Sequence, residues 1–331
     1  MLLSTTALLA RLLSAWTLQI PYEATYEDGS ETGLARTLGM LQQLVVNGLI
    51  AGCVYALVTL GFALIYRTVR FFHFAHGAVV TFGGYAAYTA YIVLGASLWL
   101  AFASALLLSG LMGMAIDRAV YRPLRRRKAP NLVFLIASFG VFLFVQSAIQ
   151  LAYGSSILSL TKGSIVPGHE VLGVVITNTQ IAILLSATAL ATALWFLLRF
   201  TSLGVKIRAV ADDTLGASVV GINPESVIAA SLGIGSALAG VAGVLVGMET
   251  NLEPSMGLAL ILKGIVASII GGIGSLLGAV AGALLIGLVE AVVAWTVGAQ
   301  WQDPVVFTVL VSFLLLRPMG VAGLVTGKQR L

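Results

Sequence analysis

The run from Leu44 to Tyr66, LVVNGLIAGCVYALVTLGFALIY, decides the fold class, because it contains no charged residue and is long enough to cross a membrane as a helix. Similar runs follow along the chain, which is 59% hydrophobic and only 9% charged. A soluble domain of average composition carries roughly 25% charged residues. A chain this apolar cannot cover a globular surface with polar groups, so its solvent must be largely lipid. We therefore predict an all-α integral membrane protein.

Charge-poor segments of about the required length recur along the rest of the sequence. The apolar stretch after residue 71 divides near Gly95, and only Lys263, Glu290 and Asp303 interrupt the stretch from Pro254 to Leu316. We predict a bundle of eight or nine transmembrane helices, with re-entrant segments as the alternative for the short seventh and ninth. The expected spans are 44–66, 77–94, 98–116, 131–152, 178–198, 226–247, 258–272, 276–298 and 303–317.

Basic residues gather in alternate loops between the expected spans. Fourteen of the eighteen Lys and Arg residues fall on one side of the membrane if the spans alternate, and the positive-inside rule places that side in the cytoplasm. The loops of the other side are mainly acidic. We therefore expect a multi-pass protein of the bacterial inner membrane with a cytoplasmic C-terminus. The fourteen residues are Arg67, Arg70, Arg118, Arg122, Arg125, Arg126, Arg127, Lys128, Arg199, Lys206, Arg208, Arg317, Lys328 and Arg330.

The N-terminal part of the chain differs from the rest. Residues 1–20 are apolar around Arg11, and an acidic stretch from Glu23 to Glu31 follows. We expect residues 1–40 to form an extension that contains an extra span or an interfacial helix, with a misplaced start codon as a further alternative. A cleaved signal peptide is disfavoured, since a positively charged start and an A-x-A-like cleavage site are missing. Residues 41–331 are expected to form a single transmembrane domain.

The sequence gives no sign of catalysis, metal binding or nucleic-acid binding. It contains no G-x-x-x-x-G-K-[ST] motif, so we expect no ATP bound by this chain. His73, His76 and His169 do not make a convincing zinc site, and Cys53 is expected to be a buried, inert thiol. The net charge of +5 comes without a basic stripe interleaved with aromatic residues. We therefore expect no metal, no cofactor and no enzymatic activity in this chain.

Two segments between spans are candidates for the lining of a transport pathway. The first, Phe72 to Gly77, places histidine and glycine at membrane depth, where they are expected only if protein shields them or they line a cavity. The second, 271–279, reads GGIGSLLGA and also lies between two spans. Broken helices in the two halves of a chain are typical of transporters with an inverted repeat. Tight packing of helices explains the glycines about as well.

Small residues also recur at a spacing of four within the spans. One row is Ala239, Gly243 and Gly247, and the other is Gly274, Gly278 and Gly282. Because lipid supplies no hydrophobic drive between helices, such rows let backbones approach closely and gain van der Waals contact. We predict a tightly packed bundle.

Lys263 and Glu290 lie inside expected spans, where an unpaired charge is costly. Pairing within the bundle, a wet cavity and a position nearer the interface are three alternatives. A contact with the transported solute is a further one.

The loop 199–225 follows the fifth expected span and lies on the side where the basic residues gather. Ala211, Leu215 and Ala217 predict a short amphipathic helix, with Asp212 and Asp213 in its first half and polar residues outward. Such a helix at the mouth of a membrane protein can fit a groove of a partner protein. An ordinary solvated loop is the alternative.

The chain resembles the permeases of branched-chain amino acid ABC transporters, of the H-like subunit type. The likeness covers roughly residues 40–325, and five motifs carry it in order. At position 73 histidine replaces the family's asparagine. The motifs are Asn47-Gly48-Leu49 with Gly52 and Tyr55-Ala56-Leu57; His73-Phe74-Ala75-His76-Gly77; Asp117-Arg118 with Tyr121-Arg122-Pro123-Leu124-Arg125; Gly204, Arg208, Ala209 and Asp213 with Gly221-Ile222-Asn223; and Gly271-Gly272-Ile273-Gly274-Ser275 with Gly278-Ala279.

The resemblance implies an importer in which this chain pairs with a second, related permease, more often as a heterodimer than a homodimer. Two ATP-binding cassette ATPases, which carry the ATP and magnesium, and a periplasmic solute-binding protein complete it. An importer of urea or short-chain amides is an alternative in the same class, and an ion-coupled secondary transporter is one in another class. Residues implied in docking of the ATPase are Gly204, Arg208, Ala209, Asp212, Asp213, Gly221 and Ile222. Those expected along the pathway are Phe74, His76, Gly77, Gly271, Gly272, Gly274 and Ser275.

Overall fold

The computed structural model describes residues 33–161, 168–171, 173–317 and 320. The helix expected in residues 1–20 and the acidic stretch behind it lie outside these described residues. The chain separates into two compact units, residues 1–40 and residues 41–331. All contacts given below lie within the second unit.

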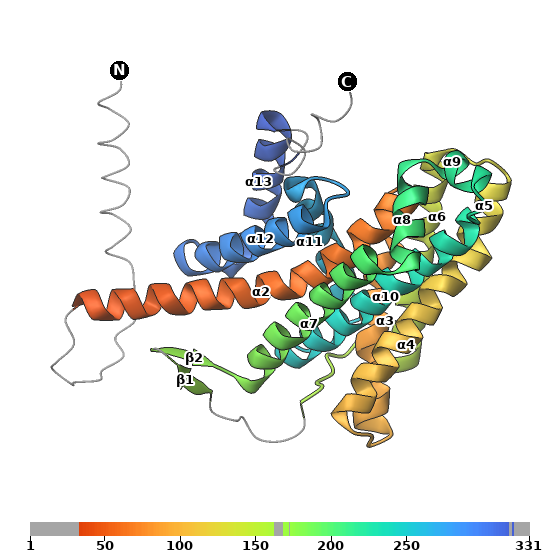
Figure 1. Cartoon of the computed structure of the whole chain (residues 1–331). Coiled ribbons are helices and arrows are strands. Elements are labelled where there is room, and N and C mark those ends of the chain that lie inside the picture. The colour runs from red at the N-terminus through yellow and green to blue at the C-terminus, as the bar shows by residue number, and fades with distance from the viewer. Residues whose placement is uncertain (1–32, 162–167, 172, 318–319, 321–331) are drawn as a thin grey trace. The chain divides into compact units, whose positions relative to one another are not determined.

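Helices make up nearly all of the regular structure in the described part of the chain (Figure 1). The strands there form one antiparallel hairpin, β1 (His169–Val171) and β2 (Val174–Ile176). The predicted all-α membrane fold is therefore confirmed. The other elements are α2 (Gly33–Val69), α3 (Ala75–Tyr88), π-helical η1 (Thr89–Val93), α4 (Leu98–Ile116), π-helical η2 (Asp117–Tyr121), α5 (Arg122–Arg126), α6 (Asn131–Tyr153), α7 (Asn178–Phe200), α8 (Ser202–Asp212), α9 (Thr214–Val219), α10 (Pro224–Glu249), α11 (Met256–Gly271), α12 (Leu276–Thr296), 3-10 helical η3 (Ala299–Trp301) and α13 (Gln302–Leu316).

Seven helical stretches of the described residues are long and apolar enough to cross a membrane, and they cover seven of the nine expected spans. The expected span 77–94 is α3 continued by η1, and it carries His76, Thr81 and Tyr85 as buried residues. A helix enclosed by protein does not need an apolar surface. The expected span 258–272 is α11, whose 16 residues fall short of the roughly 20 that a crossing requires. Whether α11 crosses or re-enters stays a prediction.

Helices α3 and α10 occupy the centre of the packing, and glycines bring their backbones into contact. α10 packs against α3, α4, α7 and α8, while α3 packs against α4, α6 and α11. A methyl group added to Gly243 would collide with the carbonyl oxygen of Val80, and one added to Gly83 would collide with the backbone of Gly240. The first row of small residues therefore mediates helix packing, as predicted.

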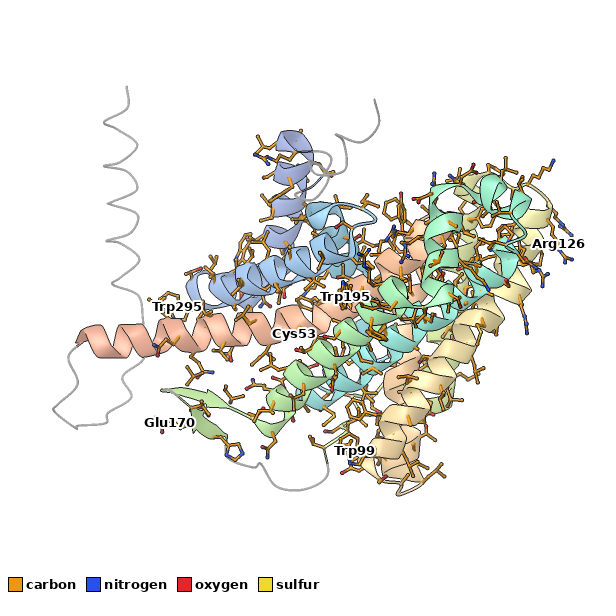
Figure 2. The ribbon with its side chains drawn as sticks, viewed as in Figure 1. Cys53, Trp99, Arg126, Glu170, Trp195 and Trp295 are labelled. Atoms are coloured by element: carbon orange, nitrogen blue, oxygen red, sulfur yellow. The ribbon has the colours of Figure 1, made fainter. Side chains whose placement is uncertain are left out.

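The second row of small residues is helical only in part. Gly278 and Gly282 lie in α12 against Gly271 and Ala267 of α11. Gly274 instead lies in the turn between these helices, with φ at 90°, a conformation that glycine adopts without steric cost. The predicted row is wrong at this residue. Cys53, expected to be buried, is half-buried at the edge of the core (Figure 2).

Candidate coupling and translocation site

The first break in the bundle, between the end of α2 and the start of α3, is enclosed by protein. His73 and His76 are fully buried. The hydroxyl of Ser138 on α6 accepts a hydrogen bond from the backbone N–H of Phe74 at 3.3 Å and lies 3.2 Å from the carbonyl oxygen of Phe72. Irregular backbone at membrane depth needs such partners, because lipid offers none.

The two buried histidines leave part of their hydrogen-bonding capacity unused. Nε2 of His76 lies 3.1 Å from the carbonyl oxygen of Val58. Since a carbonyl only accepts, this nitrogen carries the proton, and Nδ1 of the neutral ring is an acceptor. Nδ1 of His73 lies 2.8 Å from the hydroxyl of Tyr121. The remaining nitrogens, Nε2 of His73 and Nδ1 of His76, have no hydrogen-bond partner among the described residues.

Phe74 and Gly77, both expected along the pathway, pack against neighbouring helices. The ring of Phe74 stands perpendicular to that of Phe139, with centroids 6.0 Å apart. Gly77 lies so close to the carbonyl oxygen of Gly257 that a side chain would not fit. These contacts give both residues a packing role, and their place in a pathway stays a prediction.

The second break, between α11 and α12, is a glycine turn. Gly272 has φ at 103°, and the hydroxyl of Ser275 caps α12 by accepting from the N–H of Gly278 at 3.1 Å. Gly271 is buried against Gly278, and a Cβ on Gly274 would lie 3.5 Å from Cγ of Arg67 in α2. The turn therefore lies beside the end of α2 that leads into the first break.

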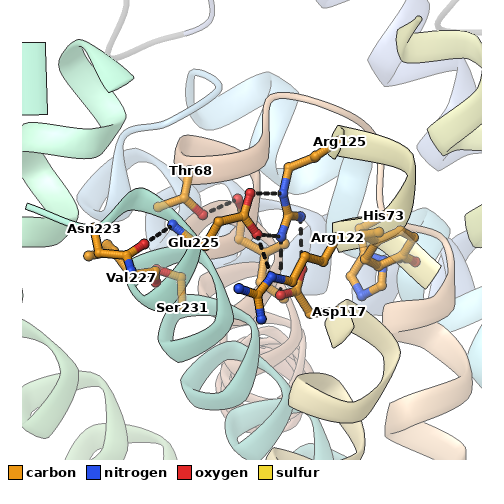
Figure 3. A network of polar contacts seen from close by, with 11 residues as sticks. Thr68, His73, Asp117, Arg122, Arg125, Asn223, Glu225, Val227 and Ser231 are labelled. Carbon is orange, nitrogen blue, oxygen red and sulfur yellow. Dashed lines mark hydrogen bonds and ion pairs between the residues drawn. The ribbon is translucent and has the colours of Figure 1, made fainter. Parts of the chain in front are cut away.

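An ion-paired clamp, formed by Asp117, Arg125 and Glu225, joins η2 and α5 to the start of α10 (Figure 3). Arg125 donates to both oxygens of Asp117 at 2.8 and 3.2 Å and to both oxygens of Glu225 at 3.1 and 2.7 Å. The Asp117 side chain is 1% exposed and that of Arg125 is 18% exposed. Such bidentate pairs fix geometry as well as adding energy.

The π-helical segment η2 connects this clamp to the first break. It begins at Asp117 and ends at Tyr121, so one end holds a clamp carboxylate and the other holds the hydroxyl that meets His73. Tyr121 is fully buried. π-helical turns occur frequently at functional sites, and in η2 both Asp117 and Tyr121 are buried.

The loop expected to dock a partner contains two helices instead of one. Helix α8 ends at Asp212, and Asp213 caps α9 by accepting from the N–H of Leu215 at 2.9 Å. Because the helix breaks here, Leu215 lies 79% exposed; its expected position on an inward face is wrong. Ala211 and Ala217 are buried as that pattern requires.

The predicted docking residues have structural partners of their own. Arg208 donates to the carbonyl oxygen of Leu198 at the end of α7, and Gly204 is buried against the same turn, where a side chain would not fit. Asp212 is exposed, whereas Ala209 and Ile222 are half-buried against the core. Gly221 is exposed, with φ at 83°. Their role in docking stays a prediction.

Exposed apolar side chains on and after α9 were missed by the sequence analysis. Leu215, Val219 and Val220 are 79%, 87% and 73% exposed. Hydrophobic side chains this exposed, on a short helix outside the spans, are typical of a surface that a partner covers.

Arg70 ties this segment to the first break. Its guanidinium donates to the carbonyl oxygen of Ala211 at 2.6 Å, and its own backbone takes φ of 56° directly before the irregular residues 71–74. The sequence offered only the charge of Arg70 as a signal. Its left-handed backbone, rare outside glycine, could not be anticipated.

Lys263 and Glu290 form an ion pair between α11 and α12, with Nζ and Oε1 2.8 Å apart. The tyrosine hydroxyl of Tyr55 donates to Oε2 of Glu290 at 2.5 Å, and Asp303 lies 3.3 Å from Nζ. Oε1 of Glu290 has no aligned hydrogen bond among the described residues. The attraction between it and Nζ of Lys263 is therefore mainly Coulombic. The sequence left several arrangements open for Lys263 and Glu290. In the structure the two residues pair with each other within the bundle.

A family of known proteins matches most of this chain. The sequence profile of the family described as "Branched-chain amino acid transport system / permease component" matches residues 44–316. The chain belongs to this family. This membership confirms the resemblance carried by the five motifs.

Two curated relatives of the permease are similar along most of its length. BraD of Pseudomonas aeruginosa, named a high-affinity branched-chain amino acid transport system permease protein, is 37% identical over 296 residues, which cover 86% of this chain and 95% of that protein. LivH of Escherichia coli K12, of the same description, is 35% identical over 299 residues, which cover 86% and 96%. The permease is therefore a multi-pass inner-membrane protein of this transport family.

One solved structure, PsaBC from Streptococcus pneumoniae in complex with Fab, matches 87% of the permease and 95% of its own chain. The TM-score of this match is 0.48 and the sequence identity is 14%.

Proposed function

We propose that this permease imports branched-chain or chemically related amino acids. A periplasmic binding protein delivers the solute, and two ATP-binding cassette ATPases drive the transport. The observation that carries the proposal is the surface of α9, on which Leu215, Val219 and Val220 are exposed beside the ion-paired clamp at the start of α10. Because this surface lies next to bonds that reach the first break, a partner that binds there can bias the bundle between two states.

Two routes lead from the docking surface to the buried histidines. The first runs through Arg70, which bonds to the end of α8 and precedes the first break. The second runs from Glu225 through Arg125 to Asp117 and along η2 to Tyr121 and His73. The other steps run along the backbone itself, from α9 to Glu225, along η2 and from Arg70 into the break, so displacement of α8 and α9 would be felt at the break.

The predicted partners and orientation fit this arrangement. Basic loops at the α8–α9 side support a cytoplasmic position for the ATPases and for the C-terminus, and we assign ATP and magnesium to those partners. A second, related permease completes the membrane part. The ion-coupled alternative is disfavoured, because Glu290 is already paired with Lys263 and is not a free carrier of ions.

Co-purification from the native membrane tests the proposal. A tagged permease is expected to bring down a P-loop ATPase and a second permease, and Leu215→Asp with Val219→Asp is expected to lose the ATPase while it keeps the second permease. The matched control is Val171→Asp with Val175→Asp, which adds the same charges to exposed apolar positions of the hairpin. A wild-type chain that purifies alone and transports in vesicles without ATP would refute the proposal.

A further inference from the structure

A hollow of about 350 Å³ opens where the α4–α5 stretch leaves the membrane, and its lining is almost entirely arginine. It is formed by Arg118, Arg122, Arg126 and Arg127 together with Pro123. Arg126 lies at that end of the chain's helices in Figure 2, among other nitrogen-tipped side chains. The candidate span Leu98–Arg126 ends here. Arginines interrupt its apolar sequence from Arg118 onward, and about 20 residues suffice to cross the hydrocarbon core, so we take the hollow to lie among the lipid headgroups.

The charges around the hollow do not balance. The two carboxylates nearby, Asp117 and Glu225, are matched by two guanidinium groups, those of Arg125 and Arg122. The side chains of Arg118, Arg126 and Arg127 make no hydrogen bond or ion pair with any residue that the structure describes, and of these three Arg126 attracts the Glu225 carboxylate from a longer distance. Like charges at a spacing of four on a helix repel each other, so the bare arrangement carries an electrostatic cost that an anion would remove.

The hollow also contains an unused hydrogen-bond donor. Nε of Arg122 is buried and has no hydrogen-bond partner among the described residues, because its contact with Glu225 is 3.6 Å long. Both oxygens of Glu225 are already engaged by Arg125. Leaving a buried donor without a partner is unfavourable, and a ligand oxygen would satisfy it.

General rules for basic residues explain only part of this arrangement. The positive-inside rule and the attraction of cations to the C-terminal end of a helix both favour arginine in this loop. Neither rule requires the side chains to surround one hollow, and neither provides a partner for the buried Nε of Arg122.

We infer that the hollow binds a phosphate group, and specifically the phosphodiester of an anionic phospholipid such as phosphatidylglycerol. Guanidinium groups bind phosphate oxygens in a bidentate manner, and basic pockets at the ends of membrane helices suit anionic headgroups. The position at the end of a span favours a lipid over free phosphate, since the acyl chains can lie along the apolar surface of α4, where Leu107 and Leu111 are exposed.

Native mass spectrometry of the detergent-solubilised permease tests this inference. Phosphatidylglycerol, phosphatidylcholine and inorganic phosphate are added separately to delipidated protein. Phosphatidylglycerol is expected to bind at least about tenfold more tightly to the wild type than to the triple variant Arg118→Gln, Arg126→Gln and Arg127→Gln, because each basic residue near an anionic headgroup adds to the attraction and the variant removes three.

The matched control removes the same number of charges elsewhere. Lys128→Gln, Arg199→Gln and Arg317→Gln together lie outside the hollow, and this variant is expected to keep the affinity of the wild type. The inference is overturned if both triple variants bind phosphatidylglycerol alike, or if phosphatidylcholine binds as tightly as phosphatidylglycerol. Equal affinity for inorganic phosphate would assign the site to a soluble anion. If the hollow variant keeps its affinity for phosphatidylglycerol but no longer brings down the ATPase in the co-purification described above, the hollow is a protein contact instead.

Discussion

Single charged residues inside this bundle are arranged so that none of the described buried ones stands alone. Glu290 is 3% exposed and has Lys263 and Tyr55 as partners, and Asp117 is 1% exposed with Arg125 against it. An isolated charge in such a place would cost several kcal/mol. The pairs therefore explain how a membrane protein tolerates these residues without a solute bound to them.

Lys263 has two carboxylates near it, whereas Glu290 has one cation, so removing the lysine is expected to destabilise the protein more than removing the glutamate. Lys263→Met leaves the buried Glu290 beside Asp303 with no cation and is expected to cost about 3–5 kcal/mol. Glu290→Gln leaves the lysine with Asp303, which lies 3.3 Å away, so it should cost less. Thermal unfolding of the detergent-solubilised permease measures both.

The double variant separates pairing from other effects. Lys263→Met with Glu290→Gln leaves no buried unpaired carboxylate, so it is expected to be more stable than Lys263→Met alone. If the costs of the two single changes simply add, the two side chains do not act as a pair.

The pairing of Lys263 could not be derived from the sequence. Two charges in separate spans were visible, but which faces of α11 and α12 meet depends on the glycine turn between them. The sequence therefore left four arrangements open. The histidine at position 73 was visible as a departure from the family pattern, while its partner Tyr121 lies 48 positions away and gave no sign of the contact.

At the scale of helices, composition and spacing predicted most of the elements. Seven expected spans are present because long apolar runs have few alternatives in lipid. The shorter segments were harder to predict from the sequence. Helix α3 is enclosed by protein, so its surface carries polar residues. Helices α8 and α9 are separated by one capping residue, Asp213. Asp213, followed by Thr214 and Leu215, was an available signal for a new helix start, yet the pattern of small residues across it favoured one helix.

Glycines at the contact of α3 with α10 differ from glycines that face outward, and this difference can be measured. Gly243→Ala is expected to destabilise the fold by about 1–3 kcal/mol, because the added methyl group meets the backbone of Val80 and overpacks the contact. Gly140→Ala on α6 has nothing within 4 Å, and it is expected to be neutral or to stabilise by up to about 1 kcal/mol.

Thermal unfolding of both glycine variants in the same detergent is the measurement. A Gly243→Ala protein as stable as the wild type would show that the two backbones do not depend on this close approach.

At the scale of the whole permease, the bond between His73 and Tyr121 is the last step of the proposed route from the ATPase side to the first break. Tyr121→Phe removes this bond alone. We expect the amount of amino acid transported per ATP hydrolysed to fall roughly fivefold to tenfold, the factor that corresponds to one buried hydrogen bond. Transport and hydrolysis are measured together on the complete transporter in proteoliposomes.

Two further variants make this coupling test specific. His73→Asn should retain more coupling than His73→Ala, because the carboxamide can still bond to the hydroxyl. Tyr66→Phe removes a hydroxyl that makes no hydrogen bond with any described residue, and it should leave the ratio unchanged. Equal ratios in wild type and Tyr121→Phe would exclude this bond from the route.

Close contact between the backbones of α3 and α10 also determines how motion can spread through the permease. No side chains lie between them at Gly83 and Gly243, so rotamer changes cannot absorb a displacement there, and the two helices must tilt as one stiff lever. With 26 residues, α10 is roughly 39 Å long. A tilt of about 5° at its Glu225 end would therefore carry the opposite end through about 3 Å, roughly the width of a water molecule.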